Sequence, residues 1–332
     1  MTSKKPKPFL SSEAILALAL VAALIILAAA PWWASRSDIR LMGEFFSFLG
    51  LAVLWNLLAG YAGLLSVGQQ AFVGIGGYTL FVISAKIGLS PYIALLTAPL
   101  AGALVAAIFA PLLFRLNGAY FAIGTWVAAE TISLCFGMIP ELGGGAGMSL
   151  PVATVKAIAA NRPDREAYIY WMLLSMGMGT LIGAYLLLRS KAGLALMAIR
   201  DNSLAAGSLG IDIWKTKFLI YVGVAAVTSL LGAVIFLQKL RISPDSAFNV
   251  NDWTVYIIFI VVIGGIGRLE GALLGTILFF ITRELLADLG AVYLIVLGLI
   301  AIVTMLISRV GLWGLLEQKT GWTIFPVTRK VD

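Results

Sequence analysis

This chain of 332 residues is 61% hydrophobic and only 12% charged, whereas soluble domains carry about a quarter charged residues. Its surface lacks the polar cover that water requires, which excludes a soluble globular protein and makes lipid the solvent. A single cysteine, Cys135, and the absence of histidine exclude an internal disulfide framework and histidine-based metal or acid–base sites, and the net charge of +7 comes from basic residues between apolar segments, not from a nucleic-acid-binding face. We therefore expect an all-α polytopic membrane protein.

The first predicted helix covers residues 14–33, which are uncharged and follow a basic tail of residues 1–13. A helix needs about 20 apolar residues to cross the hydrocarbon core. A cleaved signal peptide is the competing interpretation. The apolar run is longer than a typical signal core, and Pro31-Trp32-Trp33 is a poor small-residue cleavage site. We predict a retained membrane helix.

Residues 46–85 carry no charge and are long enough for two crossings, but glycine and polar residues interrupt their middle, at positions 60–70. Gly63 and Gly68 are expected to break or pack helices there. Amides and hydroxyls at membrane depth are tolerated where protein buries them or where they line a wet cavity. Ser66, Gln69 and Gln70 are therefore candidates for the translocation pathway, with packing an equally weighted alternative.

Four further spans are predicted at residues 92–114, 119–139, 167–188 and 218–237. The second of these contains Glu130 near its centre. A carboxylate at that depth is costly unless it is paired or hydrated, so it is a functional candidate. It could carry protons, contact a substrate ammonium group or form structural hydrogen bonds. We favour a structural or pathway role, because one carboxylate is thin evidence for a proton relay.

The segment 253–282 is expected to form two short arms, and residues 291–308 form the last span. Glycines interrupt or pack these arms: Gly264, Gly265, Gly267, Gly271 and Gly275. The chain then has about ten crossings, or eight if the short pieces do not cross. The predicted transmembrane domain covers residues 14–309, and residues 310–332 form a cytoplasmic tail.

Basic residues orient the predicted topology, because they collect in loops on the inner side of a membrane. With ten crossings and the amino terminus inside, fourteen of the 23 Lys and Arg residues lie on the inner side and nine on the outer side. We therefore predict an inner-membrane protein with both termini in the cytoplasm.

Two loops are long enough to have a function: a periplasmic loop at residues 140–166 and a cytoplasmic loop at residues 189–217. The cytoplasmic loop is rich in Ala, Leu and Ile, and Leu196, Ile199 and Ser203 follow helical spacing. We predict a short helix that lies under the membrane. An amphipathic helix that only anchors the domain is the alternative interpretation.

Several separated motifs occur together, in order: NLLAGYAGLLSVGQ at 56–69, GAYFAI at 118–123, RDN at 200–202 with LGI at 209–211, and GGIG at 264–267. With these motifs the chain, from about residue 51 to residue 308, resembles the branched-chain amino acid permeases of ATP-binding-cassette (ABC) importers, in their LivM-like branch. The resemblance implies a membrane subunit that works by alternating access.

The resemblance further implies that the cytoplasmic loop docks on a cytosolic ATPase. Small residues would allow close approach and polar residues would set the register; the matching positions are Leu194, Arg200, Asp201, Asn202, Ala205, Ala206 and Gly210. The implied partners are two ATPase subunits, a second related permease in a heterodimer, a periplasmic binding protein and membrane lipid. ATP and Mg²⁺ would bind on the ATPase subunits, and no cofactor on this chain.

The chain has no phosphate-binding G-x-x-x-x-G-K-[ST] motif of its own and no nucleophile–base or metal set, so we expect a transport subunit and not an enzyme. The substrate stays open between branched-chain amino acids, urea or short amides, and small carboxylates. An ion-coupled secondary transporter that uses Glu130 is the alternative from another class.

Overall fold

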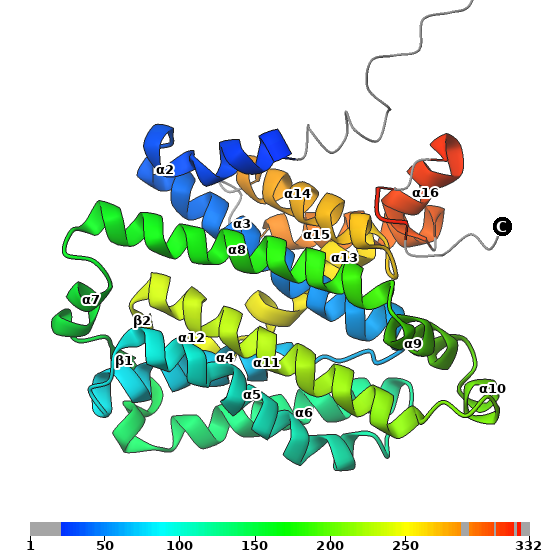
Figure 1. The fold of residues 1–332 in the computed structure, drawn as a ribbon, viewed down its shortest axis with the longest axis horizontal. Coiled ribbons are helices and arrows are strands. Elements are labelled where there is room, and N and C mark those ends of the chain that lie inside the picture. The colour runs from blue at the N-terminus through cyan, green and yellow to red at the C-terminus, as the bar shows by residue number, and fades with distance from the viewer. Residues whose placement is uncertain (1–20, 287–291, 309, 322–323, 327–332) are drawn as a thin grey trace, which may run out of the picture.

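The computed structural model describes residues 21–286, 292–308, 310–321 and 324–326. The predicted tail of residues 1–13, the start of the first predicted span and most of the last ten residues lie outside the described part. Among the described residues the chain is helical apart from loops and one pair of two-residue strands, which confirms the all-α prediction (Figure 1).

Residues 21–28 are helical. The helices and strands that follow are α2 (Ala30–Trp33), α3 (Arg36–Asn56) with the π-helical turn η1 (Leu57–Tyr61), α4 (Gln69–Phe81) with the π-helical turn η2 (Val82–Lys86), α5 (Pro91–Leu113), α6 (Ala119–Gly137), η3 (Pro140–Leu142), η4 (Gly144–Ala146), β1 (Met148–Ser149), α7 (Val152–Ile158), α8 (Arg162–Leu188), α9 (Lys191–Asp201), α10 (Ser203–Ser208), α11 (Ile213–Lys239), β2 (Arg241–Ile242), α12 (Pro244–Ala247), η5 (Asn251–Val255), α13 (Tyr256–Gly264), α14 (Leu269–Leu285), α15 (Val292–Ile307) and α16 (Gly311–Thr320).

Six helical segments in the described part are long and apolar enough to cross a membrane. A seventh is possible if Leu294–Ile307 and Gly311–Thr320, which meet at 41°, count as one bent span. The sequence predicts eight to ten crossings; the first of them, residues 14–33, begins outside the described residues, and other predicted crossings are short elements. The helix α4 has only 13 residues and α14 has 17, at or below the length that spans the hydrocarbon core.

Polar caps fix where several of these helices begin. Ser35 and Asp38 form a reciprocal capping box at α3, and the Ser90 hydroxyl accepts from the amide of Ile93 at the start of α5. Such caps satisfy amides that the first helical turn leaves unpaired. The helix starts are therefore encoded by single polar residues between long apolar runs.

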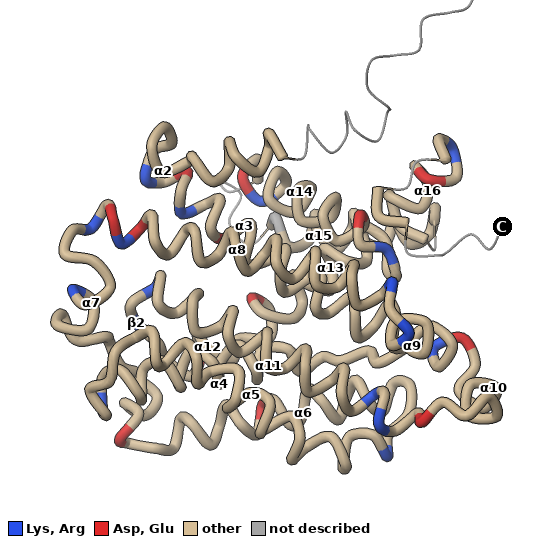
Figure 2. Tube along the Cα trace, viewed as in Figure 1, with Lys and Arg blue, Asp and Glu red and all other residues tan. Residues whose placement is uncertain are grey.

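Most charged residues lie toward the two ends of the long axis, and a smaller number lie along the middle (Figure 2). At one end β1 pairs antiparallel with β2, with Met148 opposite Ile242 and Ser149 opposite Arg241; we call it the sheet end. At the other lie α9 and α10, and we call it the α9 end. This distribution is that of a protein whose middle lies in hydrocarbon.

Two helices form the centre of the molecule. From Phe46 onward every residue of α3 is buried, and α4 is buried on all faces. The helix α3 packs on α8, and α4 packs on α5 and α11. Glycines allow the closest contacts: an added Cβ at Gly76 would overlap the carbonyl oxygen of Ser229, and one at Gly232 would overlap that of Val73. Small residues thus bring α4 and α11 together, as is common in membrane helices.

We expect Gly76→Ala to destabilise the chain by about 1–3 kcal/mol, the usual cost of overpacking a tight contact. The measurement is the thermal unfolding midpoint of the purified chain in detergent. Gly298→Ala is the matched control, because an added Cβ there has nothing within 4 Å. Equal midpoints for both variants would contradict the packing described for α4 and α11.

Candidate functional site

Three segments meet at the α9 end: the π-helical turn η1, the break between α13 and α14, and α9 itself. The Asn56 side chain is fully buried and holds the break with both ends of its amide. Its Nδ2 donates to the carbonyl oxygen of Arg268 at 2.8 Å, and its Oδ1 accepts from the amide of Gly267 at 2.8 Å. One side chain thus replaces the helical hydrogen bonds that the break removes.

Arg200 ties α9 to this junction. Its guanidinium donates to the carbonyl oxygen of Gly60 in η1 at 2.8 Å and forms an ion pair with the neighbouring Asp201 at 2.8 Å. Gly60 in turn packs on Gly267, whose φ of 77° favours glycine, and a Cβ on Gly60 would meet the Gly267 amide nitrogen at 2.5 Å. The loop between α8 and α11 therefore contacts the end of α3 directly. We call Asn56, Gly60, Arg200 and Gly267 the α9-end junction.

The C-terminal segment also holds the break. Arg268 forms an ion pair with Glu317 of α16 at 2.6 Å, and Gly265 packs against Gly311. The buried Glu270 side chain accepts from the amides of Ile324 and Phe325, at 3.0 Å and 2.6 Å. The predicted glycines Gly264, Gly271 and Gly275 form the tight contact between α13 and α14, where an added Cβ would meet backbone atoms.

The loop predicted at residues 189–217 forms two short helices, not one. Asn202 ends α9 and caps α10, because its side chain accepts from the amide of Ala205 at 3.0 Å. Gly193, Leu196, Ile199 and Ala206 face the protein and are buried. The opposite surface carries Asp201, Ala205 and Gly210 together with three leucines that are 67–84% exposed: Leu194, Leu204 and Leu209.

Exposed leucines at a charged, water-facing end are costly unless another surface covers them. We call Leu194, Leu204 and Leu209 the leucine surface. Figure 1 shows α10, which carries Leu204 and is followed by Leu209, projecting beyond the ends of the long helices, while Leu194 lies on α9. The arrangement suits a protein partner that binds at the α9 end.

The amides proposed for the pathway lie inside the molecule in this conformation. Ser66, Gln69 and Gln70 are at most 1% exposed. Gln69 Nε2 donates to the hydroxyl of Thr228 in α11 at 3.0 Å, and the Thr254 hydroxyl in η5 donates to Gln70 Oε1 at 2.5 Å. The start of α4 is therefore bound to two other helical segments. Within the described part, Gln69 Oε1 and Gln70 Nε2 have no hydrogen-bond partner.

Backbone polar groups of the extended segment that precedes α4 also have hydrogen-bond partners in other helices. The Trp55 indole donates to the carbonyl oxygen of Ser66 at 2.7 Å, and the amide of Val67 donates to the Thr125 hydroxyl of α6 at 2.9 Å. Gly68 lies against the carbonyl of Thr125, where a Cβ would meet that oxygen at 2.5 Å. Gly63, with a φ of 69°, turns the chain into this segment beside Arg200.

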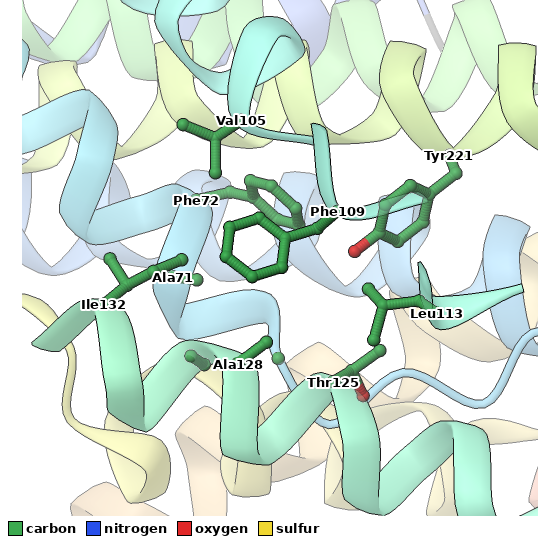
Figure 3. A pocket seen from close by; sticks show the side chains of 11 residues that line it. Ala71, Phe72, Val105, Phe109, Leu113, Thr125, Ala128, Ile132 and Tyr221 are labelled. Carbon is green, nitrogen blue, oxygen red and sulfur yellow. The ribbon is translucent and has the colours of Figure 1, made fainter. Parts of the chain in front are cut away.

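Beside this segment a cavity of about 10 Å³ separates α4, α5, α6 and α11 (Figure 3). Its walls are mainly apolar, with Phe72 and Phe109 on one side, while Tyr221 and Thr125 supply hydroxyl groups. A space of this size holds about one water molecule. This cavity is therefore too small to hold an amino acid.

Glu130 lies apart from Ser66, Gln69 and Gln70. It is half-buried on α6, where the Trp126 indole donates to its Oε1 at 3.2 Å, and it does not line the cavity. The residues that line it from the same helix include Thr125, Ala129 and Ile132. The structure thus separates Glu130 from Ser66, Gln69 and Gln70.

Sequence reasoning missed Asn56, Thr228 and Thr254 as the partners that hold these segments. Asn56 is a polar residue inside an otherwise apolar stretch, and that is the signal by which it could have been found, whereas Thr228 and Thr254 have other polar residues close to them in sequence. Which amide or backbone group each one meets depends on contacts 159 to 212 residues away in sequence.

Comparisons with known proteins agree on one family. The family described as "Branched-chain amino acid transport system / permease component" matches residues 39–308. The chain is 28% identical to the high-affinity branched-chain amino acid transport system permease protein LivM of Salmonella typhimurium and 29% identical to that of Escherichia coli, each over 89% of this chain and 74% of the relative. It is 25% identical to a probable branched-chain amino acid transport permease protein LivM of Methanocaldococcus jannaschii, over 73% of this chain and 75% of that one. No solved structure matches.

We expect Asn56→Leu to destabilise the chain by about 1–3 kcal/mol, because two buried backbone groups of the break lose their partner. The measurement is the thermal unfolding midpoint in detergent. Asn117→Leu, at an exposed position between α5 and α6, should leave the midpoint nearly unchanged. A midpoint for Asn56→Leu equal to that of the control would mean that the amide does not hold the break.

Proposed function

Because the chain belongs to the branched-chain amino acid transport permease family, we propose that it moves branched-chain amino acids across the inner membrane. The family match covers residues 39–308, and six or seven helical segments of the described part can cross a membrane. The chain is thus a multi-pass membrane protein and the permease subunit of an ABC importer. The relatives that are named for branched-chain amino acid transport support the choice of substrate.

The permease of such a system works with ATPase and other subunits. We assign two cytosolic ATPase subunits to the α9 end and a periplasmic binding protein to the sheet end, and we propose that both termini lie in the cytoplasm. A second, related permease subunit completes the membrane part. ATP and Mg²⁺ then belong to the ATPase subunits, and this chain binds no cofactor.

The leucine surface supports this assignment. An ATPase cleft that covers Leu194, Leu204 and Leu209 would remove from water apolar side chains that are each more than two-thirds exposed. The polar residues Asp201 and Asn202 between them would fix the register of the docked loop. The contact needs no rearrangement of this chain, because α10 already projects from it.

The α9-end junction gives the docked loop a route to the centre of the membrane domain. A displacement of α9 pulls on Gly60 through the guanidinium of Arg200. Gly60 is packed on Gly267, which Asn56 holds in turn. The end of α3 and the break between α13 and α14 therefore move with the loop. We propose that this movement opens the closed arrangement around Gln69 and Gln70.

We expect Arg200→Ala to lower leucine uptake several-fold while the assembled importer still hydrolyses ATP, because the loop stays docked but loses its link to Gly60. The measurement is uptake and ATP hydrolysis of the reconstituted complex, side by side. Arg115→Ala is the control, because Arg115 is exposed at the end of α5 and forms no ion pair among the described residues. Parallel loss of both activities would place Arg200 in docking and not in transmission.

The function itself is tested by uptake of labelled leucine in cells with and without this chain. We expect chain-dependent uptake that excess valine blocks, that urea and benzoate do not block, and that stops on ATP depletion with the proton gradient intact. Competition by urea or benzoate, and not by valine, would instead assign the chain to amides or small carboxylates.

The same uptake assay separates the importer from an ion-coupled transporter. Glu130→Gln should retain most of the uptake, because a Gln oxygen can still accept from the Trp126 indole. Ion coupling at Glu130 would be established by two results together: a folded Glu130→Gln variant loses all uptake, and uptake by the wild-type chain resists ATP depletion.

A further inference from the structure

An open apolar groove of about 460 Å³ lies between α8 and α11, and Leu54 of α3 and Leu57 of η1 also line it. Its only side-chain hydroxyls are those of Ser175 and Thr180, and each of these donates to a carbonyl oxygen of its own helix at 2.8 Å. The groove therefore offers an occupant no unsatisfied polar side chain. Its lining suits an alkyl chain.

The groove runs along only part of each helix. On α8 its lining residues run from Ser175 to Leu187, in the half nearer α9. On α11 they run from Leu219 to Leu230, which begins six residues after the start of the helix and ends four residues past its midpoint. At 1.5 Å per residue these stretches are about 17 Å long, close to the roughly 15 Å of one leaflet's hydrocarbon. The groove is thus about one leaflet in length and lies toward the α9 end.

The glycines of the groove serve no contact within this chain. An added Cβ at Gly179, Gly183 or Gly223 would have nothing within 4 Å. Gly177 lies on the same helix but does not line the groove. It differs from the three glycines, because a Cβ there would meet the carbonyl oxygen of Phe46 at 2.6 Å. The three glycines leave space for something that the chain itself does not supply.

The mouth of the groove is basic. Arg189 lies two residues beyond Leu187, just after α8, where its guanidinium also donates to the Tyr185 hydroxyl at 3.0 Å. Lys217 lies two residues before Leu219 on α11. Lys191 and Lys215 lie next to them in sequence, and Figure 2 shows basic residues gathered at this end. The nearby Asp212 caps α11, since its side chain accepts from the amide of Lys215 at 2.9 Å. Cations at the surface end of an apolar groove complement a lipid with a negative headgroup.

We propose that this groove binds an anionic phospholipid of the leaflet at the α9 end. One acyl chain lies over Gly179, Gly183 and Gly223, and the phosphate pairs with Arg189 and Lys217. A membrane-spanning helix from another subunit fits less well, because the groove is about one leaflet in length while such a helix continues across both leaflets.

The test is native mass spectrometry of the full-length chain in detergent, with phosphatidylglycerol and phosphatidylcholine of identical acyl chains added in equal amounts. We expect the wild-type chain to retain phosphatidylglycerol in preference to phosphatidylcholine. Equal retention of the two lipids would overturn the proposed headgroup contact, and retention of neither would overturn the site.

Two kinds of variant separate the acyl chain from the headgroup. Gly183→Leu and Gly179→Leu fill the groove with a side chain and should lose most of the retained lipid, whereas Gly298→Leu, an equally open helical glycine on α15, should not. Arg189→Gln with Lys217→Gln should keep lipid binding but lose the preference for phosphatidylglycerol.

Thermal unfolding of each variant shows that it is folded. Wild-type lipid retention in both groove variants would overturn the proposal. So would a groove variant that keeps its lipid but no longer assembles with the second permease, because the groove would then be a subunit interface. None of these readings depends on which solute the importer carries.

Discussion

Backbone amides and carbonyls inside a bilayer find no water, so every interruption of a helix there needs a partner supplied by the protein. In the described part, side chains of other segments supply such partners at two interruptions: the extended residues 62–68, and the break at residues 265–268, which lies at the α9 end. Trp55 and Thr125 supply the partners of the first, and Asn56 supplies those of the second. Trp55 and Asn56 are neighbours on α3, so adjacent residues of one helix contribute partners to both interruptions.

This dependence explains why α3 lies at the centre. A helix that contacts both interruptions must lie between the segments that carry them. Accordingly, α3 is buried over its whole second half. The same arrangement brings Gly60 against Gly267 and within reach of Arg200. The interruptions are thus joined to each other and to the loop of α9 and α10 at the α9 end. A membrane protein built of uninterrupted helices would have no such junction.

The sequence predicted the fold class, the positions of the long spans and the break at glycines 264–267, because apolar length and glycine clusters are local signals. It predicted a short helical loop at residues 189–217, which proved to be two helices because Asn202 caps the second. The burial of Gln69 and Gln70 could not be predicted, since α4 is apolar on all faces and gives no sign of which face is covered. The partners Thr228 and Thr254 lie far away in sequence, and only the packed structure brings them to α4.

A single long helix, α11, joins the sheet end to the α9 end. The helix α11 has 27 residues without proline, is about 40 Å long, and runs directly from α10 to β2, whose Ile242 pairs with Met148. A rod of that length that tilts by about 5° about one end moves its other end by about 3.5 Å. A protein that binds the short sheet and a partner that displaces α10 therefore act on opposite ends of the same helix. The two sides of the membrane can thus be mechanically coupled through α11 without any solute between them.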